Sequence, residues 1–96
     1  MKTKFYRAAT AEPENALDWY ASRSPMVEAK FAGALEKALT SIETSPARYV
    51  KLSRRHRACR VIGFPYQLIY RVEGDVLVIV AVAHTSQRPG YWIRRK

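Results

Sequence analysis

The sequence predicts an α+β fold in which a helical hairpin packs on one face of an antiparallel sheet. Two observations lead to this prediction. The segment from Phe64 to His84 has the composition of a strand, a tight Gly74-Asp75 turn and a second strand. The segment from residue 10 to residue 44 instead places apolar residues at helical spacing. Helices followed by a run of strands favour helices on one side of an antiparallel sheet, in the order β-α-α-β-β-β.

The first elements are a short strand and a helix. Lys4 to Ala9 is expected as a strand because of its aromatic residues. Thr10 to Arg23 is expected as a helix, since Glu12-Pro13-Glu14 combines a proline tolerated in the first turn with carboxylates suited to the positive helix end. Trp19 lies at the border of the apolar face, where we expect partial exposure.

The second helix, Pro25 to Thr44, is the clearest helical pattern in the chain. Ser24 is the expected N-cap, and Pro46 follows the helix end. Its apolar stripe consists of Val27, Phe31, Ala34, Leu35, Ala38, Leu39 and Ile42. The only large apolar partner for this stripe is the sheet, so the hairpin should lie across one sheet face.

Three consecutive strands complete the sheet. A basic connector, Ala47 to Ala58, is expected as a packed loop leading into a strand at Arg57 to Ile62, and Gly63-Phe64-Pro65 as the next turn. The strand Val76 to Ala83 is almost wholly apolar and should bury both of its faces, and it is too short to cross a bilayer as a helix. Pro89 to Lys96 is expected to form one helical turn.

Length and charge restrict the classes of function. A chain of 96 residues forms one domain, residues 1–96, with one modest core. Seventeen Lys and Arg against eight Asp and Glu give a net charge of +9. This excess favours a polyanionic partner, such as nucleic acid, an acidic protein or a membrane surface. The alternative is that the charge serves only solubility.

Cysteine and glycine usage exclude several kinds of site. Cys59 is the single cysteine, which fits a reducing, cytoplasmic location, and a small core residue is its simplest role. One cysteine and two histidines predict no four-ligand zinc site, and the scattered glycines predict no phosphate loop. We expect no cofactor and no metal. The N-terminus lacks the apolar run of a signal peptide.

The residues best suited to chemistry follow the core strand. Metal-free RNA cleavage needs a base, an acid and cations on the phosphate. His84 would serve as base or acid, Arg88 would hold phosphate, and Tyr91 would stack on a base or donate a proton. Arg60 and Arg71 would add charge if they face the same way. The alternatives are a hydrogen-bonded structural role for His84 and packing of Tyr91 and Trp92 onto the sheet.

A second candidate site is a basic surface for a target or a binding partner. We expect a polyanion to be attracted by several arginines of the connector, the strands and the tail. They are Arg54, Arg55, Arg57, Arg60, Arg71, Arg94 and Arg95.

Several local strings, taken together, resemble the RelE/ParE superfamily of toxins from bacterial type II toxin–antitoxin modules, also called plasmid stabilisation proteins. The resemblance covers essentially the whole chain. The residues that carry it are Ala16-Leu17-Asp18-Trp19-Tyr20, the helix Phe31 to Ile42 followed by Ser45-Pro46, Phe64-Pro65-Tyr66 through Tyr70-Arg71-Val72, the strand ending at His84, and Arg88-Pro89-Gly90-Tyr91-Trp92.

The resemblance implies a small basic toxin held inactive by an acidic antitoxin that wraps around it, with no membrane partner. The superfamily divides in activity. ParE-like members poison DNA gyrase and are not enzymes, whereas RelE-like members are mRNA interferases that cut messenger RNA on the ribosome. The Phe-Pro-Tyr and Arg-Pro-Gly-Tyr-Trp strings are closer to the ParE branch. The alternatives are a RelE-like endonuclease using His84 and Arg88, and a non-toxic relative that only binds its antitoxin.

Overall fold

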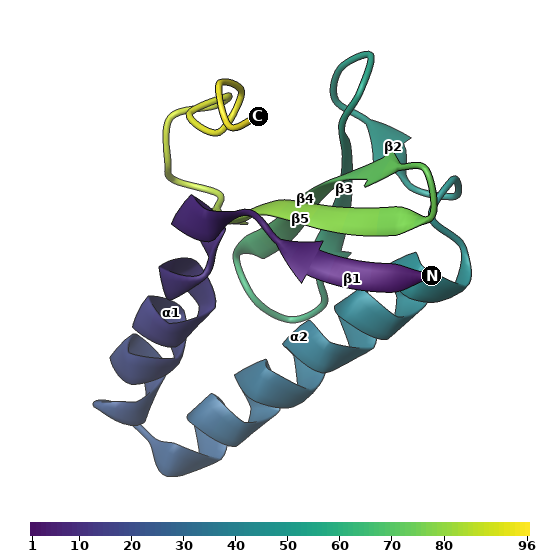
Figure 1. The fold of residues 1–96 in the computed structure, drawn as a ribbon. Helices are drawn as coiled ribbons and strands as arrows, with labels where there is room; N and C mark the ends of the chain where they lie inside the picture. Colours follow the sequence, from purple (N-terminus) through teal and green to yellow (C-terminus); the bar gives the residue numbers. More distant parts are fainter.

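The computed structural model describes residues 1–96 and has the predicted α+β architecture (Figure 1). Two helices cover one side of a five-stranded sheet, and the C-terminal segment lies on the other side. The elements are β1 (Lys2–Phe5), a 3₁₀ turn (Arg7–Ala9), α1 (Ala11–Ala21), α2 (Pro25–Thr44), β2 (Val50–Lys51), β3 (Arg57–Val61), β4 (Tyr66–Glu73) and β5 (Val76–His84). None of the helices combines the length and apolarity needed to span a bilayer.

The sheet places the last strand next to the first. The strand order is β1-β5-β4-β3-β2, with β1 parallel to β5 and all other pairs antiparallel. The tight turn between β4 and β5 contains Gly74 with a φ of 63°, a left-handed conformation that favours glycine. β1 and β5 can run parallel because the whole helical hairpin and the β3–β4 meander separate them in the chain.

Two hydrophobic clusters sandwich β5, as its composition predicts. Leu77, Ile79 and Val82 face the helices, where they pack in a cluster with Phe31 and Ile42. The opposite side of β5 packs in a second cluster with Trp92 of the C-terminal segment. A β-bulge at Val80, where β4 pairs with Ile79 and then with Ala81, changes the alternation of facing residues.

The helical hairpin follows the expected capping. The backbone N–H of Val27 donates to the Ser24 hydroxyl at 3.4 Å, and Pro25 occupies the first helical position. α2 therefore begins and ends as predicted. Trp19 is 51% exposed, in agreement with its position at the border of the apolar face.

Three sequence-based expectations need correction. The first strand covers Lys2–Phe5 instead of Lys4–Ala9, because it extends only as far as it pairs with β5. The pairing begins where the Lys2 amide donates to the Asp75 carbonyl and ends where the Tyr6 amide donates to the Ile79 carbonyl. The tail after Pro89 forms successive tight turns and no helix, with Ile93 and Arg95 donating to carbonyls three residues back. The connector contains the short strand β2, which was not predicted because two residues carry no periodicity.

A buried tyrosine fastens the sheet to the end of the hairpin. The hydroxyl of Tyr70 in β4 donates to the carbonyl of Pro46, and the side chain is fully buried. Burial is the main cause that raises the pKa of Tyr70 to about 12. The neutral form is therefore the one that the fold stabilises.

We expect the free energy of unfolding to fall as the pH rises from about 10 to about 12, because the unfolded tyrosine loses its proton before the folded one. Urea titrations across this range measure the decline. Tyr70→Phe should lower the stability at neutral pH and make the alkaline decline shallower. Parallel curves for the wild type and the variant would contradict this role of Tyr70.

Candidate functional site

A carboxylate from α1 hydrogen-bonds to the edge of β5 at the point where β1 no longer covers it. Beyond Ile79 the β1 ladder has ended, and the Glu12 carboxylate accepts the backbone N–H of Val82 at 2.8 Å. Arg95 donates to the carbonyl of Val80 at 2.9 Å and to both Glu12 oxygens at 3.2 and 3.1 Å. These contacts join the start of α1, the bulge in β5 and the tail.

Tyr91 belongs to the same network. Its hydroxyl donates to Glu12 at 2.9 Å. Burial, followed by the hydrogen bond and charge of Glu12, raises the pKa of Tyr91 well above its usual value. A phenol held neutral and already donating to a carboxylate is poorly placed to give its proton to a substrate. We call Glu12, Tyr91 and Arg95 the tail clasp.

The tail clasp holds Trp92 against the face of the sheet opposite the helices. Trp92 is buried, and its ring lies 4.8 Å from the ring of His56. The Nδ1 atom of His56 is 3.0 Å from the Ser53 hydroxyl, and its Nε2 atom is buried without a partner. Burial, then the charges of Arg71 and Arg55, lower the pKa of His56. His56 is therefore a neutral packing residue beneath the tail.

His84 is held by the turn that follows β5. The backbone N–H of Ser86 donates to Nδ1 at 3.0 Å, and the Ser86 hydroxyl lies 2.7 Å from the same atom. Since Nδ1 accepts a hydrogen bond, the proton of the neutral ring is on Nε2. The ring also packs edge-on against Tyr66 at 4.9 Å. These contacts agree with the structural alternative for His84.

The five candidate catalytic and phosphate-binding residues do not form one cluster. His84, Arg88 and Tyr91 border one hollow of about 450 Å³. Arg60 lies two strands away from β5 and borders a different groove. Arg71 is buried and pairs with Glu73, and it also donates to the carbonyl of Arg95 at 2.7 Å. The hollow therefore has a single free cation, Arg88.

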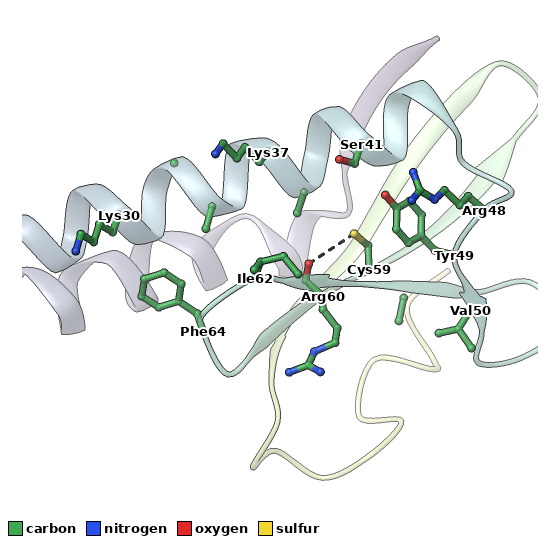
Figure 2. A pocket seen from close by; sticks show the side chains of 14 residues that line it. Lys30, Lys37, Ser41, Arg48, Tyr49, Val50, Cys59, Arg60, Ile62 and Phe64 are labelled. Carbon is green, nitrogen blue, oxygen red and sulfur yellow. Dashed lines mark hydrogen bonds between the residues drawn. The ribbon is translucent and has the colours of Figure 1, made fainter.

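A larger groove lies between α2 and β3 (Figure 2). Its volume is about 1090 Å³. Phe64 lies at one end and Arg48, Tyr49 and Val50 at the other, with the small residues Gly33, Ala34 and Ala38 of α2 along one wall. Ile62 at the end of β3 is 79% exposed. An open groove with these walls is suited to an apolar segment of a partner.

The groove combines a strand edge with positive charge. β2 pairs only with Arg57 and Ala58, so the following residues of β3 have no neighbouring strand on that side. The border carries four exposed cations, Lys30, Lys37, Arg48 and Arg60, and no carboxylate. Figure 2 shows the Arg60 side chain pointing away from α2. Such an edge can accept a strand from an acidic partner.

Two features of the site were not predicted. Glu12 was assigned to the helix start, and nothing in its sequence neighbourhood indicates that it contacts residues 70 and 83 positions later. The groove also has no sequence signal, because it depends on how far β2 extends along β3. Arg94 remains exposed at the surface, whereas Arg95 is held by the tail clasp.

The α+β fold, with its helical hairpin on one side of the sheet, defines the structural class of the protein, and the comparisons identify its family. Residues 4–89 match the family described as the ParE toxin of the type II toxin–antitoxin system, parDE, and the chain belongs to this family. A solved structure described as the chromosomal ParDE toxin–antitoxin system from P. aeruginosa has the same fold, with a TM-score of 0.75. It is 17% identical, and the match covers 88% of this chain and 95% of the other. A search of curated protein sequences gave no match.

The tail clasp predicts a specific effect of Glu12→Ala. Three donors would lose their acceptor, so we expect a loss of about 1–3 kcal/mol of unfolding free energy. In a Trp19→Phe background, the fluorescence of Trp92 should shift to the red as the tail loosens.

Glu14→Ala is the matched control, since it removes an exposed carboxylate from the same first turn of α1. It should leave the Trp92 emission unchanged. Equal shifts in both variants would assign the effect to the helix terminus and not to the tail clasp.

Proposed function

We propose that this chain is the toxin of a type II toxin–antitoxin module that acts in the cytoplasm by poisoning DNA gyrase, and that an acidic antitoxin neutralises it. Membership of the ParE toxin family is the observation that carries the proposal. The ParE-like strings around Phe64 and Arg88 favour gyrase as the target.

The arrangement of the candidate catalytic residues favours this proposal over messenger RNA cleavage. Transesterification at phosphate needs a proton acceptor and more than one positive group near the same atom. Here the Nδ1 atom of His84 accepts hydrogen bonds within its own turn, Tyr91 donates to Glu12, and Arg88 is the one free cation nearby. Arg60 and Arg71 lie elsewhere.

The groove between α2 and β3 is the surface that we assign to the antitoxin. Apolar positions such as Ile62 and Phe64 would hold apolar side chains, and the surrounding cations would pair with carboxylates. A disordered antitoxin segment that orders along the β3 edge would gain backbone hydrogen bonds there.

We expect Ile62→Glu to weaken binding of the antitoxin at least tenfold, because a carboxylate would occupy an apolar contact and repel an acidic partner. The product of the neighbouring gene is the antitoxin to test, by calorimetry or surface-based binding. Met26→Glu is the matched control, since Met26 is 67% exposed on α2 and lies outside the groove. Equal affinities of the wild type and Ile62→Glu would remove the groove from the interface.

The gyrase assignment predicts that the purified chain at micromolar concentration inhibits supercoiling and increases cleaved DNA. The double variant His84→Ala, Arg88→Ala should keep this activity and its toxicity to cells. If the double variant folds and binds the antitoxin but is harmless, while ribosome-bound messenger RNA is cut only by the wild type, the RelE-like mechanism replaces ours. Growth without any defect on overexpression would indicate a non-toxic relative.

A further inference from the structure

A second cationic surface lies at the β4–β5 turn end of the sheet. β1, β5 and β4 are in register there, with Lys4 beside Val78 and Val78 beside Arg71. Lys2 pairs with Val76, which in turn pairs with Glu73. Charged side chains from β1 and β4, the two neighbours of β5 in the sheet, thus flank the apolar β5.

Two neighbouring hollows hold these cations. One, of about 690 Å³, is bordered by Lys2, Lys4, Arg7, Arg71 and Lys96. The other, of about 330 Å³, is bordered by Lys51, Arg54, Arg55, Arg57 and Arg71. Arg71 belongs to both, so the two sets of five contain nine different cations. We call these nine residues the cationic face.

The positive charge of the cationic face is almost uncompensated. Glu73 is the only acidic side chain that borders either hollow. It pairs with Arg71 and, at 3.7 Å, with Arg55, and the remaining seven cations have no carboxylate partner. The hydrogen bond from Arg71, then the surrounding positive charge, lowers the pKa of Glu73. A surface with this balance concentrates anions.

The lining favours phosphate over an acidic polypeptide. Protein interfaces depend on apolar and aromatic anchors in pockets, and Val72 is the only exposed large apolar residue bordering either hollow. The groove between α2 and β3 provides such anchors, and the cationic face does not. Five of the nine cations are arginines, and guanidinium groups bind phosphate through two parallel hydrogen bonds.

The lining also favours a duplex over a single strand. Single-stranded nucleic acids bind by stacking their bases on exposed aromatic rings. Tyr70 is fully buried with its hydroxyl on Pro46, and Phe5 and Tyr6 are half-buried in the two clusters. A surface that has cations but no stacking platform suits the backbone of paired strands.

We propose that the cationic face binds the phosphate backbone of duplex DNA. This site shares no lining residue with the antitoxin groove, and it goes beyond the proposed function because it requires no topoisomerase. If the chain does act on gyrase, the same face would hold the DNA segment bound to that enzyme.

The test is fluorescence anisotropy of a labelled duplex with the full chain over a range of salt concentrations. The logarithm of the binding constant should fall linearly with the logarithm of salt, with a slope of about −0.9 for each phosphate neutralised. In Lys51→Ala, Arg54→Ala the slope should become smaller by about 2, and the affinity at low salt should fall at least tenfold. Both residues are exposed, so the variant should fold.

Two further variants make the assignment specific. Lys30→Ala, Lys37→Ala removes the same charge from the groove and should leave DNA binding and its salt slope unchanged, while weakening the antitoxin complex. Glu73→Gln removes the single carboxylate of the cationic face and should tighten DNA binding, a gain that misfolding cannot produce.

Equal losses of DNA affinity in Lys51→Ala, Arg54→Ala and in Lys30→Ala, Lys37→Ala would overturn the proposal, since net charge alone would then explain binding. Tighter binding of single-stranded RNA than of duplex DNA would overturn it as well, as would preferential binding of polyglutamate. The anisotropy assay contains no gyrase, so a failure to bind DNA in it would not contradict inhibition in the supercoiling assay. Conversely, duplex binding without gyrase inhibition would uphold the cationic face and reject the proposed target.

Discussion

The structure depends on covering both faces of β5. This strand has no polar side along most of its length, so it is stable only between two apolar layers. The helical hairpin supplies one layer, and the tail, fastened at Glu12, supplies the other. The edge of β5 adds a second requirement, because the Val80 carbonyl and the Val82 amide extend past the end of β1. The tail clasp satisfies both requirements at once.

This arrangement divides the remaining surface into separate regions. On the helix side, the short β2 leaves β3 with an open edge and a groove beside α2. The tail covers part of the sheet face opposite the helices, and cations gather at the β4–β5 turn end of the sheet. In our proposals, the antitoxin and DNA bind to different ones of these regions. The ion pair between buried Arg71 and exposed Glu73 lies where the two cationic hollows meet.

Local patterns were sufficient to predict most of the fold. The limits of α2, the β4–β5 hairpin and the burial of β5 on both faces follow from periodicity, capping and turn chemistry, which act over a few residues. The first strand was misplaced because its length depends on a partner more than seventy positions away. The tail was expected to form one helical turn, because Pro89 can open a helix and Tyr91-Trp92-Ile93 can pack. Its turns instead accompany its contacts with Glu12 and the packing of Trp92 against His56.

The candidate site was less predictable because it, too, depends on contacts between residues that are distant in the chain. His84, Arg88 and Tyr91 were correctly placed near one another, since they are close in the chain. Whether Arg60 and Arg71 join them depends on strand order and on the direction of side chains, which the sequence does not encode locally. In the structure these two arginines lie apart. Arg71 borders the same hollow as Lys2 and Lys4 of β1, and no sequence pattern connects them with it.

The clasp between Glu12 and Arg95, 83 residues apart, also has a consequence for synthesis on the ribosome. The helices and the meander emerge early, but the outer side of β5 stays uncovered until Arg95 has left the exit tunnel. During that interval the nascent chain exposes an apolar strand with an open edge, the kind of surface that aggregates or recruits chaperones. The fold is therefore completed late, because the second apolar layer on β5 forms only after the residues of the tail clasp have left the ribosome.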